Sequence, residues 1–286
     1  MHILLPYLGR INLDHEITLH ELKRLPVYPF DKWMRVFTVF GGLEFVFTLP
    51  GCWIPFVHWL WRIPSVMASS TMVSREIEDR TWHVLRVTPL TAREIMLAKY
   101  AAIFRYMDPH LMVVTYIRAV PAIIFAATWL VSTITVLPQQ GFAYWFSRTV
   151  ALAFAGAYFL ISPVLDVAMD GAIGLLASAL SQRRSTALIM ALLARMSGWL
   201  LPLALAAPLQ FGQYGAFGGL FGGARPDFST LRAISIVSTY GPTYAFLWGI
   251  PVWISVVVVV GIFLLRLGLA RLMLELAIVR ADRIEV

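Results

Sequence analysis

Residues 240–266 read YGPTYAFLWGIPVWISVVVVVGIFLLR, and the final Arg266 is their only charged residue. A helix needs about 20 mostly apolar residues to cross the hydrocarbon of a bilayer, so this stretch is long enough to span it. Five other apolar stretches of suitable length lie at about 34–50, 54–74, 110–137, 147–181 and 185–207. The sequence therefore predicts an all-α polytopic membrane protein with six transmembrane helices.

The composition favours a membrane protein over a soluble one. Of the 286 residues, 59% are hydrophobic and 14% are charged, and the mean hydropathy is +0.75. A soluble globular enzyme would need more polar surface, so that class is excluded. The net charge of +7 is interpreted as loop charge that sets orientation, and no nucleic-acid partner is expected. The single Cys52 excludes an intrachain disulfide framework and a cysteine-ligated metal cluster.

Basic residues are concentrated on one side of this six-span arrangement. That side holds those of both termini, of the segment 75–105, and of the turn between the fourth and fifth spans. The other side holds Arg148, Arg225 and Arg232. Cytoplasmic loops carry an excess of lysine and arginine, so both termini are predicted to be cytoplasmic. We therefore expect a multi-pass protein of the inner (cytoplasmic) membrane.

The chain divides into three parts on this basis. They are a cytoplasmic N-terminal segment with an interfacial helix (1–33), a transmembrane domain (34–266) with a cytoplasmic loop (75–95) and an outer loop (208–239), and a cytoplasmic C-terminal helix (267–286). The N-terminal helix is expected because Thr18 and Glu21 have the spacing of a capping box and Pro26 follows them. The basic C-terminal helix is expected to contact lipid headgroups, with a partner site as the alternative.

The cytoplasmic residues 74–100 read SREIEDRTWHVLRVTPLTAREIMLAKY. Apolar residues at helical spacing in the first half predict an amphipathic helix, and Pro89 ends it. Thr91 and Glu94 have capping-box spacing, so a second helix is expected to begin there. A helix, a sharp turn and a helix with an apolar stripe would suit docking into a groove of a soluble partner. A solvated linker that keeps its charges out of the lipid explains the same pattern, and both interpretations stay open.

The pattern from Arg75 to Lys99 resembles the cytoplasmic loop between the second and third spans of ABC-2 type transporter permeases. In this sequence it reads RExEDRTWxxLxxTPLTxxEIxLxK. The six-span plan, the amphipathic N-terminal helix and residues 171–184 are also similar to that family. In the family this loop carries a coupling helix that touches the ATP-binding subunit. The resemblance implies that role for Glu76, Glu78, Asp79, Arg80, Thr81, Trp82, Leu85 and Pro89.

The resemblance also implies the partners. The chain has no Gly-x-x-x-x-Gly-Lys motif, so it cannot be an ATPase by itself. ATP and Mg²⁺ are then expected on a separate ATP-binding cassette subunit, and this chain needs no cofactor or metal of its own. Family permeases work as two membrane halves, which implies a second copy of this permease or a related chain. The implied mechanism is alternating access around a path at the interface of the two halves.

Several charged residues lie inside the predicted spans, where each costs roughly 2.5–3.5 kcal/mol on insertion scales. They are Glu44, Arg62, Arg118, Asp166, Asp170 and Arg195. Asp166 and Asp170 are four residues apart and share a helix face, at a depth that makes Arg118 a candidate partner. Glu44 is similarly placed for Arg62. The first five of these residues are candidates for a polar transport path, and paired structural charges are the alternative.

Three classes of function follow from these patterns. The first is the permease subunit of an ABC transporter, an exporter. The second is a permease-like subunit that serves a structural or assembly role in another membrane complex. The third, a membrane-embedded enzyme, lacks His-x-x-x-His, Gly-x-Ser-x-Gly and comparable motifs, so we expect a transport subunit without enzymatic activity of its own.

Overall fold

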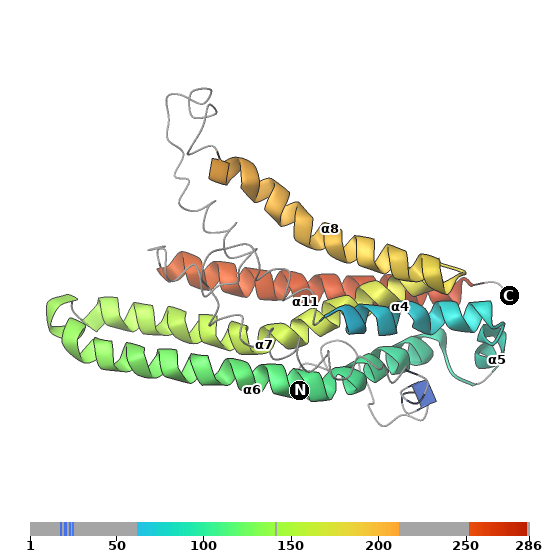
Figure 1. Ribbon diagram of the computed structural model, residues 1–286, viewed down its shortest axis with the longest axis horizontal. Coiled ribbons are helices and arrows are strands. Elements are labelled where there is room, and N and C mark those ends of the chain that lie inside the picture. Colours follow the sequence, from blue (N-terminus) through green and yellow to red (C-terminus); the bar gives the residue numbers. More distant parts are fainter. Residues whose placement is uncertain are drawn as a thin grey trace. The chain divides into compact units, whose positions relative to one another are not determined.

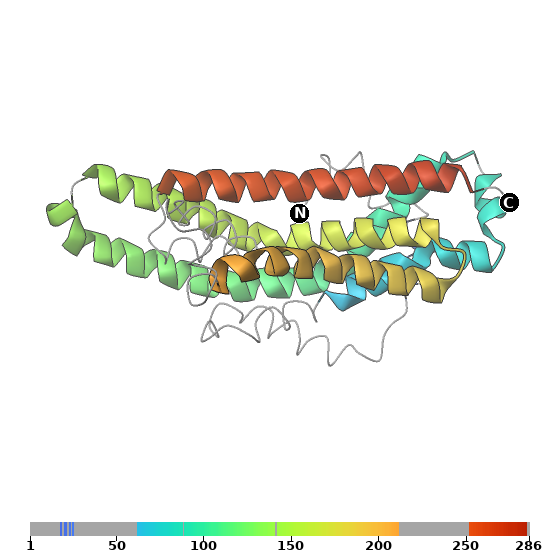
Figure 2. The same cartoon turned by 90° about the horizontal axis from the view of Figure 1, so that it is seen from above.

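The computed structural model describes residues 62–87, 89–140, 142–211 and 252–284, together with Thr18, His20, Glu21, Lys23 and Leu25. The regular secondary structure of these residues is helical throughout (Figures 1 and 2), which confirms the predicted all-α class. The helices that bear on function are α4 (Ile63–Glu78), α5 (Trp82–Arg86), α6 (Ala92–Gln140), α7 (Phe142–Leu180), α8 (Arg184–Phe211) and α11 (Val252–Asp282).

One segment of the described residues, Leu160–Leu180 in α7, is long and apolar enough to cross a membrane, and most of it is buried within the protein. Length and composition alone also suit the core helix of a soluble protein. The six-span arrangement therefore stays a prediction. The span at 34–50 and all but the first residues of the loop at 208–239 lie outside the described residues.

Several helices continue past the ends of the apolar stretches that predicted them. Helix α4 continues past the predicted span end at 74 to Glu78, and α11 runs without interruption through Arg266 to Asp282. Helix α6 is continuous over 49 residues, so the charged stretch before residue 110 does not break it. Helix α7 likewise contains Pro163 in its interior. Charged residues and a proline therefore occur within these segments, but the helices continue through them.

The described helices contribute to two compact units. The first comprises residues 1–115, 163–195 and 265–286, and the second comprises residues 116–162 and 196–264. The candidate coupling segment (75–95), Arg62, Asp166 and Asp170 belong to the first unit.

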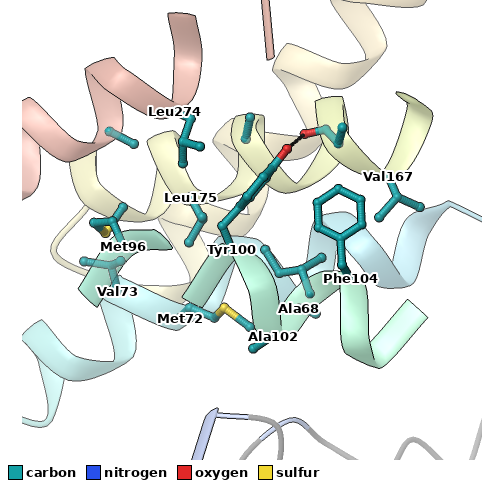
Figure 3. Packing of buried hydrophobic residues seen from close by; sticks show 14 of the residues in the cluster. Ala68, Met72, Val73, Met96, Tyr100, Ala102, Phe104, Val167, Leu175 and Leu274 are labelled. Atoms are coloured by element: carbon teal, nitrogen blue, oxygen red, sulfur yellow. Dashed lines mark hydrogen bonds between the residues drawn. The ribbon is translucent and has the colours of Figure 1, made fainter. Parts of the chain in front are cut away.

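The core of the first unit forms around Tyr100 and Phe104 of α6 (Figure 3). Their rings meet edge to face with centroids 5.1 Å apart, the arrangement that aromatic pairs favour. The Tyr100 hydroxyl donates a hydrogen bond to the Ala168 carbonyl of α7 at 2.9 Å. Burial, and secondarily the negative charge of Asp170, raises the pKa of Tyr100 above its usual range. The phenol therefore stays protonated and holds α6 against α7.

Helices α4 and α7 approach each other closely within the same unit (Figures 1 and 2). A Cβ at Gly174 of α7 would lie 2.6 Å from the Ser69 Cβ and 2.9 Å from the Ser70 backbone nitrogen of α4. One turn further along, the Ser178 hydroxyl accepts hydrogen bonds from the backbone N–H groups of Val73 and Ser74, each at 2.8 Å. Small residues thus let the two backbones come together, and a hydroxyl joins them.

Candidate coupling segment and buried ion pairs

Helix α4 ends in a tight reversal at Asp79–Thr81. The Thr81 N–H donates to the Glu76 carbonyl at 2.8 Å, and the Arg80 N–H donates to the Ile77 carbonyl at 3.1 Å. These two bonds form a Schellman motif, which places Arg80 in the left-handed region with φ 56°. Glycine is the usual residue at this position, so its absence hid the reversal from the sequence pattern. The amphipathic helix predicted up to Pro89 is wrong in this respect: α4 ends first, and α5 begins separately at Trp82.

Helix α5 is anchored by one side chain and exposes others. The Trp82 indole is 2% exposed and belongs to the core of the first unit. Its N–H has no hydrogen-bond partner among the described residues, so it is held by packing. Leu85 packs against the same core, whereas Val84 is 52% and Val87 is 81% exposed. Trp82 thus holds the helix in place, while Val84 and the following Val87 expose aliphatic side chains.

The start of α6 confirms the predicted capping box. The Thr91 N–H donates to the Glu94 carboxylate at 2.8 Å, and the Glu94 N–H donates to the Thr91 hydroxyl at 3.2 Å. The Thr91 hydroxyl also donates to the Glu94 carboxylate at 2.9 Å. Both ends of the segment between α4 and α6 therefore have defined caps.

The exposed acidic residues of the segment bind the start of α8. The Arg184 backbone N–H donates to the Glu78 carboxylate at 3.2 Å, and the Arg184 guanidinium forms ion pairs with Glu78 and Asp79. A carboxylate at this position also complements the positive end of the helix dipole. The reversal after α4 is thus attached to α8.

A buried network of charges connects to the reversal through Glu76 and Thr81. The Lys99 Nζ is 2.5 Å from the Glu21 Oε1 and 3.7 Å from the Glu76 Oε1, and all three side chains are at most 2% exposed. The Thr81 hydroxyl donates to the Glu76 carboxylate, and Arg75 pairs with Glu21 at 3.2 Å. This network ties the N-terminal segment to α4, to α6 and to the residue that precedes α5.

The residues assigned to partner contact by the family resemblance fall into three groups. Glu78, Asp79, Arg80 and Pro89 are exposed, Thr81 and Leu85 are half-buried, and Glu76 and Trp82 are buried. In this conformation only the exposed group and the outer edge of the half-buried group are accessible to a protein partner. Glu76 and Trp82 hold the segment in place instead.

A second buried cluster surrounds Asp166 and Asp170 of α7. Arg62, the residue before α4, binds both oxygens of Asp170, through its Nε at 2.8 Å and its Nη2 at 2.9 Å. Its Nη1 is 3.0 Å from the Asp166 Oδ1. Arg195 of α8 lies 2.7 Å from Asp170, and Arg266 of α11 lies 3.0 Å from Asp166. Helices α4, α7, α8 and α11 therefore meet at one set of ion pairs.

The predicted partner of Asp170 needs correction. Asp170 pairs with Arg62 and Arg195, so its predicted pairing with Arg118 is wrong. The Arg118 guanidinium instead donates to the Ser162 hydroxyl at 2.7 Å. Glu44, the predicted partner of Arg62, lies outside the described residues. Depth along a predicted span says nothing about the direction in which a side chain points, and that direction decides the partner.

Sequence reasoning missed Lys99 and Arg266 as members of buried clusters, because both were counted as cytoplasmic loop charge. One signal was available: two carboxylates four residues apart on an apolar helix require more than one cation nearby. In the part of the chain that the structure describes, no group of three histidine, cysteine or acidic side chains is placed to hold a metal ion. No model of a known protein family and no curated protein matches this sequence.

Proposed function

We propose that this chain is the membrane-spanning permease subunit of an ABC transporter, an exporter driven by a separate ATP-binding subunit. ATP and Mg²⁺ bind to that subunit, and a second copy of this permease or a related chain completes the membrane part. Lipid surrounds the helices, in the inner membrane.

The observation that carries this proposal is the anchoring of α5. Trp82 fixes the helix to the core, while Val84 and Val87 remain exposed beside it. A soluble partner that binds these exposed aliphatic side chains gains apolar contact without disturbing the fold. The family resemblance of the same stretch names that partner as an ATP-binding subunit.

The attachments of the segment explain how such binding reaches the helices. Thr81 is bonded to buried Glu76, Glu76 pairs with Lys99 of α6, and Glu78 binds the start of α8. A displacement of α5 therefore strains contacts with α4, α6 and α8 together. A partner shifts the conformational equilibrium when its contacts with α5 differ between two states.

Copurification tests the proposal. The full chain, expressed with a tag in its native host, is expected to bring down an ATP-binding subunit in stoichiometric amount, with vanadate-sensitive ATPase activity. Val87→Asp places a charge on the exposed residue that follows α5 and is expected to remove the partner and the activity while the chain still folds. Val279→Asp, on the exposed face of α11, is the matched control and should retain both.

Isolation of the chain with other membrane proteins and without an ATPase would contradict the proposal and favour a structural role. Retention of the ATPase by Val87→Asp would show that the partner binds elsewhere.

A further inference from the structure

Arg195 is the member of the second cluster whose bonding is incomplete. Its side chain is 15% exposed, and its Nε lies 2.7 Å from the Asp170 Oδ1 at an angle that makes no hydrogen bond. Asp170 itself is already engaged, because Arg62 binds both of its oxygens and the Ser65 hydroxyl donates to one at 3.4 Å. The carboxylate thus neutralises Arg62 more fully than Arg195.

The terminal nitrogens of Arg195 bond to none of the described residues. A guanidinium carries five N–H donors, and four of them belong to these two nitrogens. They are not among the buried atoms that lack a hydrogen-bond partner, whereas the Nε is, so they are open to solvent and to a ligand. A fork of this shape matches two oxygens of one phosphate or carboxylate.

The charge around Arg195 also favours an anion. Three guanidinium groups face two carboxylates in this cluster, and the charges of Arg62 and Arg266 both repel that of Arg195. An anion bound at the fork relieves this repulsion. Arg266 is 32% exposed, so it too is within reach of a ligand that approaches from outside.

We propose that Arg195, assisted by the charge of Arg266, binds an oxyanion of the phosphate type. The phosphate belongs to a lipid headgroup or to a soluble phosphate compound. The site does not depend on ATP-driven transport, so it stands or falls separately from the proposed function.

The test follows the thermal unfolding of the full chain, purified in a nonionic detergent without anionic lipid. One arm titrates inorganic phosphate against chloride at equal ionic strength, and the other titrates phosphatidylglycerol against phosphatidylcholine. We expect saturable stabilisation in at least one arm. Stabilisation by inorganic phosphate identifies a soluble ligand, and stabilisation by phosphatidylglycerol alone identifies a lipid headgroup.

Variants locate the response. Arg195→Gln is expected to weaken the apparent affinity about tenfold or more, since it removes charge-assisted hydrogen bonds. Arg195→Lys keeps the charge without the fork and should show an intermediate affinity even if the glutamine variant does not fold. Arg271→Gln, an exposed position on α11, should leave the affinity unchanged. The proposal is overturned if the wild type shows no saturable response, or if both Arg195 variants respond as the wild type does.

Discussion

Asp170 is fully buried and holds two guanidinium groups that reach it from different parts of the chain. At this scale the energetics are set by desolvation, because each charge has left water and only its partner compensates for the loss. An exposed pair, such as Asp79 with Arg184, keeps much of its hydration and contributes little. The free-energy cost of breaking an aspartate–arginine pair therefore depends on how deeply the pair is buried.

This contrast gives a prediction for two matched variants. Asp170→Asn leaves Arg62 buried without its main partner and should lower the free energy of unfolding by about 3–5 kcal/mol. Asp79→Asn makes the same chemical change at an exposed pair and should cost at most about 1 kcal/mol. Chemical unfolding of the purified chain in detergent measures both. Equal losses would mean that the buried cluster is hydrated in solution.

Among helices, the closest approach described above is that of α4 to α7 at Gly174. An alanine there would push its Cβ into Ser69 and against the backbone of α4, which cannot move without shifting the start of the coupling segment. Glycine at this position is therefore a requirement of packing.

Gly174→Ala should destabilise the protein by about 1–3 kcal/mol, the cost of overpacking a tight interface. Gly268→Ala in α11 is the control, because an added Cβ there meets nothing within 4 Å. That variant should be stabilised by about 0.5–1 kcal/mol, since alanine favours the helix. Thermal unfolding distinguishes the two signs, and stabilisation of Gly174→Ala would show that α4 and α7 are further apart than described.

The end of α4 and the start of α6 could be partly predicted from local sequence. The capping box of Thr91 and Glu94 was predictable because its bonds join residues three apart and need no other helix. The reversal at Arg80 was not, because a residue other than glycine occupies the left-handed position of its Schellman motif. Both caps are formed by local hydrogen bonds, but only that of α6 is marked by its residue types.

For the whole molecule, the proposed orientation makes a prediction about labelling. In a Cys52→Ser background, Val87→Cys places a thiol on the exposed coupling segment, and Phe142→Cys places one on an exposed residue at the start of α7. An impermeant maleimide should label Val87→Cys only in inside-out vesicles and Phe142→Cys only in right-side-out vesicles. Labelling of both from one side, or recovery of the chain outside the membrane fraction, would contradict the orientation.

The sequence by itself determined the helical class, the start of α6 and the presence of charges in apolar helices, because periodicity, capping and hydropathy are properties of neighbouring residues. Only the tertiary structure decided that Asp170 binds Arg62 and Arg195, that Lys99 is buried between Glu21 and Glu76, and that Trp82 points inward. Each of these depends on the direction in which a side chain points from its helix. That direction is set by the packing of helices against one another, which joins residues as far apart as Arg62 and Asp170 and leaves no trace in local spacing.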